Sequence, residues 1–216
     1  MRKELLAGED VFVIRDFLSA DECRQFITRS EAAGFDDAPI NAGLAGQVVR
    51  KDVRNNDRVM FDDVPLAREL WDRVKPFVPA TLDVGFNRWA AVGLNERFRF
   101  YRYAPGQRFN WHFDGCFERD SREESRLTFM VYLSDDFEGG ETEFNLKREG
   151  VVRDTDPVLR VKPVTVTALV FRHAILHQGA TVTKGLKYVL RSDVMYRFAG
   201  AIPEAFSFAG ANPDGE

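Results

Sequence analysis

The sequence has few of the residues that stabilise small proteins by cross-linking or by binding zinc. Its 216 residues include two cysteines, Cys23 and Cys116, and three histidines. The cysteines lie far apart and outside any metal-ligand spacing, which argues against a disulfide-stabilised fold. We therefore expect a reduced, cytoplasmic protein with Cys116 buried and inert, and a single disulfide between the two is the alternative.

Long apolar runs and an excess of basic charge are also missing. The first ten residues carry charges and no apolar run, so we expect neither a signal peptide nor a membrane span. A net charge of −4, from 30 basic and 34 acidic residues, argues against nucleic acid or an anionic membrane as a partner. The length fits one domain, and 19 phenylalanines supply side chains for a core.

Two segments in the first half carry helix signals. Ser19 and Glu22 match a capping box, and Gly34 predicts the end of that helix. A second helix is expected to begin at Pro65. Its apolar residues repeat at helical spacing, which we interpret as packing rather than as a cofactor site. They are Leu66, Leu70, Trp71 and Val74.

From residue 84 onward, short apolar stretches alternate with turn signals. Expected strands cover residues 97–103, 127–133, 142–144, 158–161, 164–171 and 188–198. Gly139 and Gly140 predict a tight turn with positive φ. This pattern indicates a mainly β protein with supporting helices (α+β) and a jelly-roll core, also called a double-stranded β-helix. We predict a single domain over residues 1–216, in which residues 1–83 support a core formed by residues 84–200.

Two of three charged segments allow a structural or a functional interpretation. Residues 54–58 (Arg-Asn-Asn-Asp-Arg) form either a solvated turn or a substrate-facing segment at the mouth of a barrel. Residues 97–103 alternate basic and aromatic side chains, as in a nucleic-acid platform or a half-buried barrel strand, and the acidic total favours the strand. Residues 116–126 carry charges of both signs and predict a solvated loop.

The candidate site starts from His112 and Asp114. On an extended strand these two side chains project to the same face, because successive side chains alternate. The pair alone is a weak signal, but His177 follows a buried-looking strand and supplies a second imidazole. Two histidines and one carboxylate form the facial triad that holds non-haem Fe(II) and leaves open coordination positions.

His173 has a different interpretation. His173 and His177 have the spacing of two zinc ligands on a metalloprotease helix. That motif needs a glutamate after the first histidine, and Ala174 stands there instead, among residues that indicate strand and turn. We expect His173 to pack against the site or to support a ligand.

The last expected strand places two cations on one face. Alternation puts Lys187 and Arg191 on the same side as Asp193. Cations on the inner face of a barrel are costly unless an anion meets them, and a bound dicarboxylate would supply that anion. For Arg191, pairing with Asp193 is an equally open interpretation.

Four motifs, in order, resemble the Fe(II)- and 2-oxoglutarate-dependent dioxygenases of the prolyl 4-hydroxylase type. The resemblance covers roughly residues 98–197. It consists of a Tyr-x-x-Gly lead-in at Tyr103, the His-x-Asp pair, residues 127–133 with the turn at 139–144, and His177 followed ten positions later by Lys187. The sequence departs from the family pattern at two places. Pro163 stands near a turn where the family commonly has glycine, and the residues that follow Arg191 differ from those of collagen-type prolyl hydroxylases.

The resemblance implies a role for each matching residue. It makes His112, Asp114 and His177 the iron ligands. It pairs Lys187 with the distal carboxylate of 2-oxoglutarate. Tyr103 and Tyr132 would donate hydrogen bonds to that carboxylate, and Arg191 would contact co-substrate or substrate. The implied cofactors are Fe(II), 2-oxoglutarate and O2, and ascorbate is left open as a further one.

The implied reaction is hydroxylation of an unactivated C–H bond with release of succinate and CO2. A prolyl or other protein residue is one substrate class, and a free amino acid or small metabolite is the other. The presence of Asp114 favours hydroxylation, because related halogenases lack this carboxylate. A non-catalytic metal-binding jelly-roll module and a protein-recognition domain that uses residues 54–58 are the alternatives from other classes.

Overall fold

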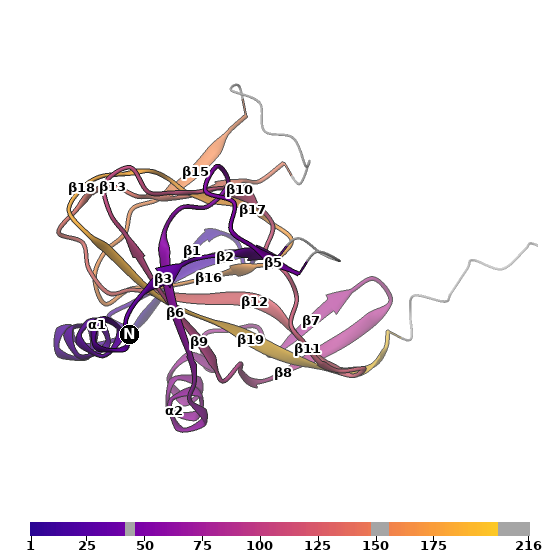
Figure 1. Ribbon diagram of the computed structural model, residues 1–216. Coiled ribbons are helices and arrows are strands. Elements are labelled where there is room, and N and C mark those ends of the chain that lie inside the picture. Colours follow the sequence, from indigo (N-terminus) through magenta and orange to yellow (C-terminus); the bar gives the residue numbers. More distant parts are fainter. Residues whose placement is uncertain (42–45, 148–155, 203–216) are drawn as a thin grey trace, which may run out of the picture.

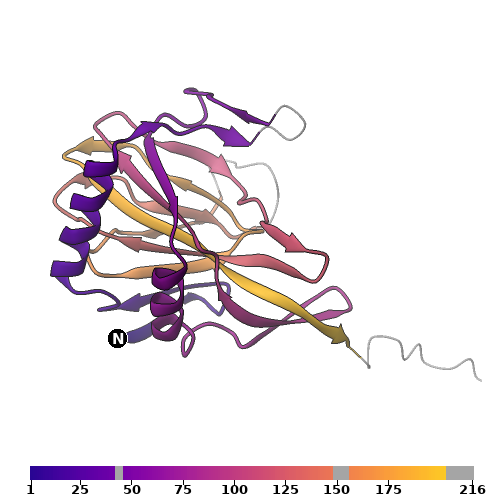
Figure 2. The same cartoon turned by 60° about the horizontal axis from the view of Figure 1, so that its bottom comes forward.

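Two facing antiparallel sheets form the body of the protein, and two helices cover the outer face of the larger one (Figures 1 and 2). The computed structural model describes residues 1–41, 46–147 and 156–202. The larger sheet has the order β1-β2-β16-β12-β19-β9-β6-β3, while β11 pairs with β12, β8 with β19 and β7 with β8. Its strands are β1 (Arg2–Ala7), β2 (Val11–Arg15), β3 (Asp36–Asp37), β6 (Asp57–Asp62), β7 (Thr81–Val84), β8 (Asn87–Leu94), β9 (Arg97–Tyr103), β11 (Glu118–Asp120), β12 (Glu123–Tyr132), β16 (Ala168–Arg172) and β19 (Lys187–Ala201).

The smaller sheet has the order β10-β17-β14-β15. Its strands are β10 (Phe109–His112), β14 (Thr142–Asn145), β15 (Val158–Val161) and β17 (Leu176–Gly179). Two further pairs lie apart from these sheets: β13 (Glu138–Gly139) with β18 (Val182–Lys184), and β4 (Ile40–Asn41) with β5 (Gln47–Val48). This arrangement confirms the predicted double-stranded β-helix with supporting helices. Strands from residues 1–83 join the larger sheet, and the division into support and core stays a prediction.

The larger sheet has an apolar core on each face because its strands alternate. On β9, Phe98 and Phe100 pack toward the helices, whereas Tyr101 and Tyr103 pack between the two sheets. The neighbouring β19 follows the same rule, with Leu190 on the helix side and Val189 between the sheets. The inner face of β9 and β19 therefore provides the floor of the site.

Both expected helices are present. α1 (Ala20–Ala33) begins with the predicted capping box and ends at Gly34, whose φ is 80°. α2 (Val64–Val74) begins at Asp63, whose side chain accepts a hydrogen bond from Leu66 N–H, with proline in the first turn. The predicted stripe of α2 packs on the core. None of the helices among the described residues is long and apolar enough to cross a membrane.

Removing the Ser19 hydroxyl should weaken the start of α1. Ser19 Oγ accepts the Glu22 N–H at 3.2 Å, and Glu22 returns a bond to the Ser19 N–H at 2.7 Å. We expect Ser19→Ala to lower the free energy of unfolding by about 1 kcal/mol in urea denaturation. Ser121→Ala, at an exposed turn, is the control, and equal losses in both variants would contradict the capping role.

Two expectations about the segment after the histidine strand are wrong. Residues 116–126 are not a loop: β11 and the start of β12 form a hairpin there, in which Glu118 lies opposite Glu124. Cys116 is exposed rather than buried, and both cysteines are free. Although the residue is exposed, partial desolvation of the thiol sulfur and its contact with Glu124 raise the pKa of Cys116 to about 11, so the thiol stays protonated and unreactive near neutral pH.

Candidate active site

His112 and His177 come from neighbouring strands of the smaller sheet. β10 pairs with β17 so that the two histidines lie directly opposite each other, with ring centroids 4.2 Å apart. His112 Nδ1 donates to the carbonyl oxygen of Asn110 at 2.6 Å, and His177 Nδ1 donates to that of Ile175 at 2.9 Å. Because each Nδ1 carries a proton in this arrangement, each Nε2 keeps a free lone pair.

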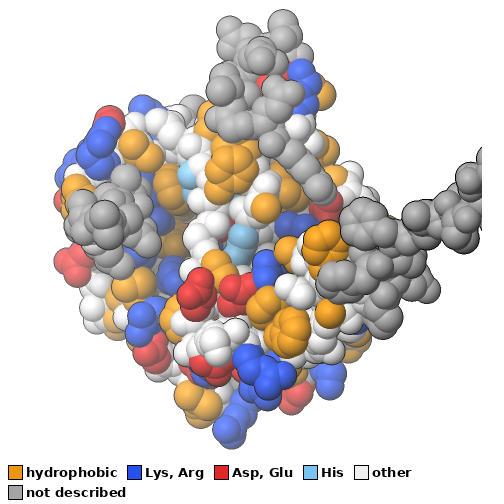
Figure 3. All heavy atoms as spheres, turned by 90° about the vertical axis from the view of Figure 1, so that its right-hand side faces the viewer, with side chains coloured by type: hydrophobic (Ala, Val, Ile, Leu, Met, Phe, Trp, Pro, Cys, Tyr) orange, Lys and Arg blue, Asp and Glu red, His pale blue; other side chains and the backbone are white. Residues whose placement is uncertain are grey.

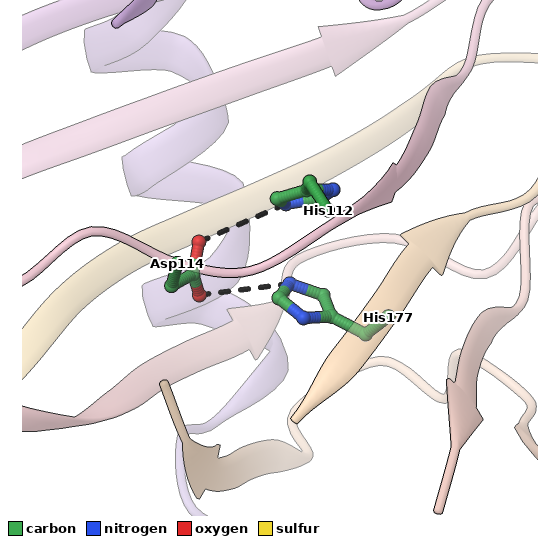
Figure 4. A group of neighbouring side chains, drawn as sticks. All are labelled: His112, Asp114 and His177. Carbon is green, nitrogen blue, oxygen red and sulfur yellow. Dashed lines mark ion pairs between the residues drawn. The ribbon is translucent and has the colours of Figure 1, made fainter. Parts of the chain in front are cut away.

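Asp114 completes the group from a position just beyond the strand. β10 ends at His112, so the strand predicted to carry both residues is shorter than expected. The Asp114 N–H donates to the carbonyl of His173 at 3.2 Å, which fixes the backbone there. The Asp114 oxygens lie 3.7 Å from His112 Nε2 and 3.5 Å from His177 Nε2 (Figure 4). One ligand atom from each residue falls within 4.8 Å of the others.

The protonation states of these residues suit metal binding. Burial, with the neighbouring His177, lowers the pKa of His112 to about 3. Burial also lowers the pKa of His177. Burial alone would raise the pKa of the Asp114 carboxyl, but Arg191 and the two histidines hold it well below its usual range. Two neutral imidazoles and a carboxylate are the donors that Fe(II) takes in a facial triad, so the residues fit this ion.

The Asp114 carboxylate is held by two further side chains. Thr128 on β12 donates its hydroxyl to Asp114 Oδ2 at 2.5 Å. Arg191 Nη1 lies 2.8 Å from Asp114 Oδ1, and Arg191 Nη2 lies 3.3 Å from Asp193 Oδ1. The sequence left Arg191 either to pair with Asp193 or to contact a ligand. In the structure it pairs with Asp193 and also with Asp114. Partners of this kind orient a ligating carboxylate.

A pocket beside the three residues contains the buried Lys187. Its Nζ donates to the carbonyl of Gly140 at 2.7 Å and lies 5.1 Å from the Tyr103 ring centroid. Burial lowers the pKa of Lys187 to about 7, although Glu141 opposes this shift. Gly139 and Gly140 have φ of 74° and 69°, as predicted, and a Cβ at Gly139 would collide with the Thr181 carbonyl. This turn therefore brings a backbone oxygen to the ammonium group.

The other sequence-derived candidates fall in different places. Tyr103 and Arg191 line the pocket with the three candidate ligands and Lys187. Tyr132 does not line it; its hydroxyl shares a 2.7 Å hydrogen bond with Thr142, which does. Sequence analysis missed the lining residues Tyr101, Thr128 and Thr142. Alternation along residues 97–103 and 127–133 could have found the first two.

His173 lies behind the site rather than in it. It is buried, with Nε2 3.6 Å from Asp193 Oδ1, and it does not belong to the three-residue group found among the described residues. Its carbonyl holds the Asp114 N–H. This agrees with a supporting role.

The fold and these three residues define a double-stranded β-helix protein with the ligand set of a non-haem iron enzyme. Residues 98–192 match the sequence profile of the 2OG-Fe(II) oxygenase superfamily. The matched residues contain all three candidate ligands, so this part of the chain is similar to the superfamily, and the likeness implies an enzyme with Fe(II) and 2-oxoglutarate as its cofactors.

Named relatives agree with this assignment. A PKHD-type hydroxylase of Stenotrophomonas maltophilia (strain R551-3) is 28% identical over 198 residues, which cover 85% of this chain and 81% of that protein. Prolyl 4-hydroxylase 1 of Arabidopsis thaliana is 25% identical over 171 residues, which cover 74% of this chain and 56% of that protein. The chain thus spans little more than half the length of the plant relative.

Solved structures share the fold. A Pseudomonas putida prolyl-4-hydroxylase superposes with a TM-score of 0.61 at 22% identity, over 88% of this chain and 94% of that chain. A Trichoplax adhaerens prolyl hydroxylase, in complex with a hypoxia inducible factor peptide fragment, superposes with a TM-score of 0.62 at 14% identity, over 95% and 90%. At these identities the likeness shows the fold alone.

Proposed function

We propose that this enzyme hydroxylates an unactivated C–H bond of a peptide or small-molecule substrate. In the balanced reaction, one oxygen atom of O2 enters the C–H bond and the other enters succinate, as 2-oxoglutarate loses CO2. The observation that supports it is the buried Lys187 in the pocket that the histidines and Asp114 also line. Beside a structural metal site, a buried ammonium group would cost free energy and bind nothing. A dicarboxylate co-substrate would pair with it.

Each residue then has a defined task. His112, Asp114 and His177 would hold Fe(II), which when bound supplies the O2-dependent oxidation. Lys187 would bind the distal carboxylate of 2-oxoglutarate, with Tyr103 beside it. Tyr132 would act through Thr142, whose hydroxyl it contacts. Arg191 would keep Asp114 ionised and oriented.

Two free cysteines support a reducing, cytoplasmic location.

The anaerobic visible spectrum tests this proposal without any knowledge of the substrate. We expect a metal-to-ligand charge-transfer band when 2-oxoglutarate is added to the Fe(II)-loaded protein, and its loss in His177→Ala. Lys184→Met, which removes a lysine with 77% side-chain exposure on β18, should keep the band. Bound iron without a band in the unmodified protein would overturn the proposal and favour the metal-binding module.

The affinity for 2-oxoglutarate should fall as the pH rises above 7. Lys187 has a pKa of about 7 in the free pocket, and an adjacent carboxylate raises it by favouring the ammonium form. Binding above pH 7 therefore takes up a proton, so Kd should rise by up to about tenfold per pH unit between pH 7 and 9. Below pH 7 the lysine is already charged, so its contribution to Kd should no longer change with pH.

Calorimetric titration of the Mn(II)-loaded protein measures this slope. Pyruvate is the control ligand, because it keeps the 2-oxo acid group and lacks the distal carboxylate. The pyruvate affinity should not share the slope above pH 7. Equal slopes for both ligands would show that Lys187 does not contact the distal carboxylate.

A further inference from the structure

Four arginines meet at the outer side of the candidate ligands. A cleft of about 540 Å³ opens there, and it shares His112 and Asp114 with the inner pocket. Figure 3 looks onto this end of the protein, where histidine atoms lie in a hollow with both basic and acidic side chains beside them. The cleft is lined by Arg54, Arg58, Arg99 and Arg191. Among its described lining residues, Asp114 is the sole acid.

Strand pairing explains how three of these cations come together. Arg99 on β9 lies directly opposite Arg191 on β19, and Arg58 on β6 lies opposite Tyr101 on β9. Like charges in directly opposite positions destabilise a sheet. Asp193 compensates the pair on β9 and β19, since it lies 3.0 Å from Arg99 and 3.3 Å from Arg191. Asp114 also lies 2.8 Å from Arg191, so two carboxylates serve these two guanidinium groups.

Arg54 has a buried guanidinium nitrogen, Nη2, that lacks a hydrogen-bond partner in the described part of the chain. Its side chain is buried, with the residue 5% exposed, and Nε donates to Asn56 Oδ1 at 2.7 Å. The guanidinium lies 4.4 Å from the ring centroids of both Tyr101 and Phe109, which fixes its plane.

The surroundings of this cluster carry excess positive charge. Burial lowers the pKa of Arg58, and repulsion from Arg54, Arg99 and Arg191 lowers it further. Burial should raise the pKa of Tyr101, yet the arginines, Arg54 first, bring it below its usual value. An oxygen at this wall is therefore stabilised as an anion. Asp114 and Asp193 neutralise part of this charge, and a further anion would lower the cost of burying the unpaired nitrogen of Arg54.

We propose that the substrate of this enzyme carries an oxyanion group, a carboxylate or a phosphate, which the unpaired Nη2 of Arg54 and the neighbouring Arg58 and Arg99 bind in the outer cleft. This inference rests on the proposed function and deepens it. A guanidinium fork matches both oxyanions in a planar, paired geometry. The bound group would place the carbon to be oxidised toward His112 and Asp114, which the cleft shares with the co-substrate pocket.

Proton relaxation of small probes tests this with the Mn(II)-loaded protein at saturating 2-oxoglutarate, where no turnover occurs. The probes are benzoate, phenyl phosphate and the neutral benzamide. We expect the protons of benzoate, of phenyl phosphate or of both to relax faster than those of benzamide, because the bound probe lies near the paramagnetic ion. The anion with the larger relaxation enhancement identifies the preferred oxyanion. Relaxation that is equal for all three probes would overturn the proposal.

Variants separate the arginine site from the metal and from the co-substrate pocket. Arg54→Met should weaken binding of the anionic probe about tenfold, as expected for loss of a charged hydrogen bond. If Arg54→Met does not fold, Arg58→Met replaces it in the test. Lys51→Met, at an exposed lysine paired with Asp37, should leave the relaxation unchanged. Anion binding that is insensitive to both arginine variants would contradict the proposal.

The same preparation distinguishes this inference from the proposed function. Failure of the protein to bind Mn(II) and 2-oxoglutarate together would refute the proposed function, and this inference with it. Normal binding of both, with no preference for the anionic probes, would refute the substrate class alone.

Discussion

Lys187→Met is expected to make the protein more stable and unable to bind 2-oxoglutarate. The ammonium group has a pKa of about 7 in the folded protein against 10.5 for an ordinary lysine. At pH 7, this difference corresponds to about 4 kcal/mol of lost stability, and about 1 kcal/mol is regained through the bond to the Gly140 carbonyl. Methionine has a similar volume and no charge, so we expect a net gain of about 3 kcal/mol.

The pH dependence of unfolding gives the sign of this effect. The pKa of Lys187 is lower in the folded than in the unfolded state, so between pH 7 and 10.5 the unfolded chain binds one more proton at this residue. The contribution of Lys187 to stability therefore rises with pH across that window. In Lys187→Met this contribution is absent. The gain in stability from the substitution should be largest below pH 7. Above pH 10.5 the unmodified protein should be the more stable by about 1 kcal/mol, because the neutral amine keeps its bond to Gly140.

Urea denaturation of the metal-free protein between pH 7 and pH 10 measures both quantities. Lys184→Met is the matched control, because that lysine is exposed and should change neither stability nor co-substrate binding. A Lys187→Met protein less stable than the unmodified one would mean that the ammonium group stabilises the fold. The site would then have a structural rather than a ligand-binding lysine.

Local periodicity in the sequence was enough to predict one face of the site. Alternation along residues 187–193 placed Lys187 and Arg191 on one face, and both line the pocket. The capping box at Ser19 and the apolar stripe of α2 also depend on neighbours within one or two helical turns. These features could be predicted because each is set by residues close in sequence.

The cross-strand partners could not be predicted in the same way. The register that puts His112 opposite His177, and Arg99 opposite Arg191, joins residues from distant parts of the chain. Register depends on turn geometry and on which faces become buried, and a single sequence does not reveal it. The hydrogen bond between Thr128 and Asp114 was missed for this reason, as was the arginine cluster around Arg54.

The cluster also changes the interpretation of residues 54–58. A polar segment of this kind is typical of a solvated turn, but Arg54 is buried and Asn56 is fully buried. The backbone of Arg54 forms an isolated bridge with Phe109, at the start of the strand that carries His112. The segment is thus tied to the site, which supports the substrate-facing interpretation.

Asp114→Ala is expected to have the largest effect on activity and to destabilise the metal-free protein as well. Loss of a ligand should reduce iron affinity more than about 100-fold, since loss of a residue that only supports a ligand costs 10 to 100-fold. The same change removes one of the two carboxylates that neutralise Arg191. Breaking a buried ion pair costs about 3 kcal/mol when one charge is left without its partner.

A second substitution separates these two consequences. In Asp114→Ala/Arg191→Met the buried cation is gone, and Asp193 keeps Arg99 at 3.0 Å. We expect urea denaturation to show that the double variant recovers most of the stability lost in Asp114→Ala. The Fe(II) and 2-oxoglutarate charge-transfer band should stay absent, because methionine restores no ligand. Recovery of both stability and the band would show that Asp114 acts through Arg191 and does not bind the metal.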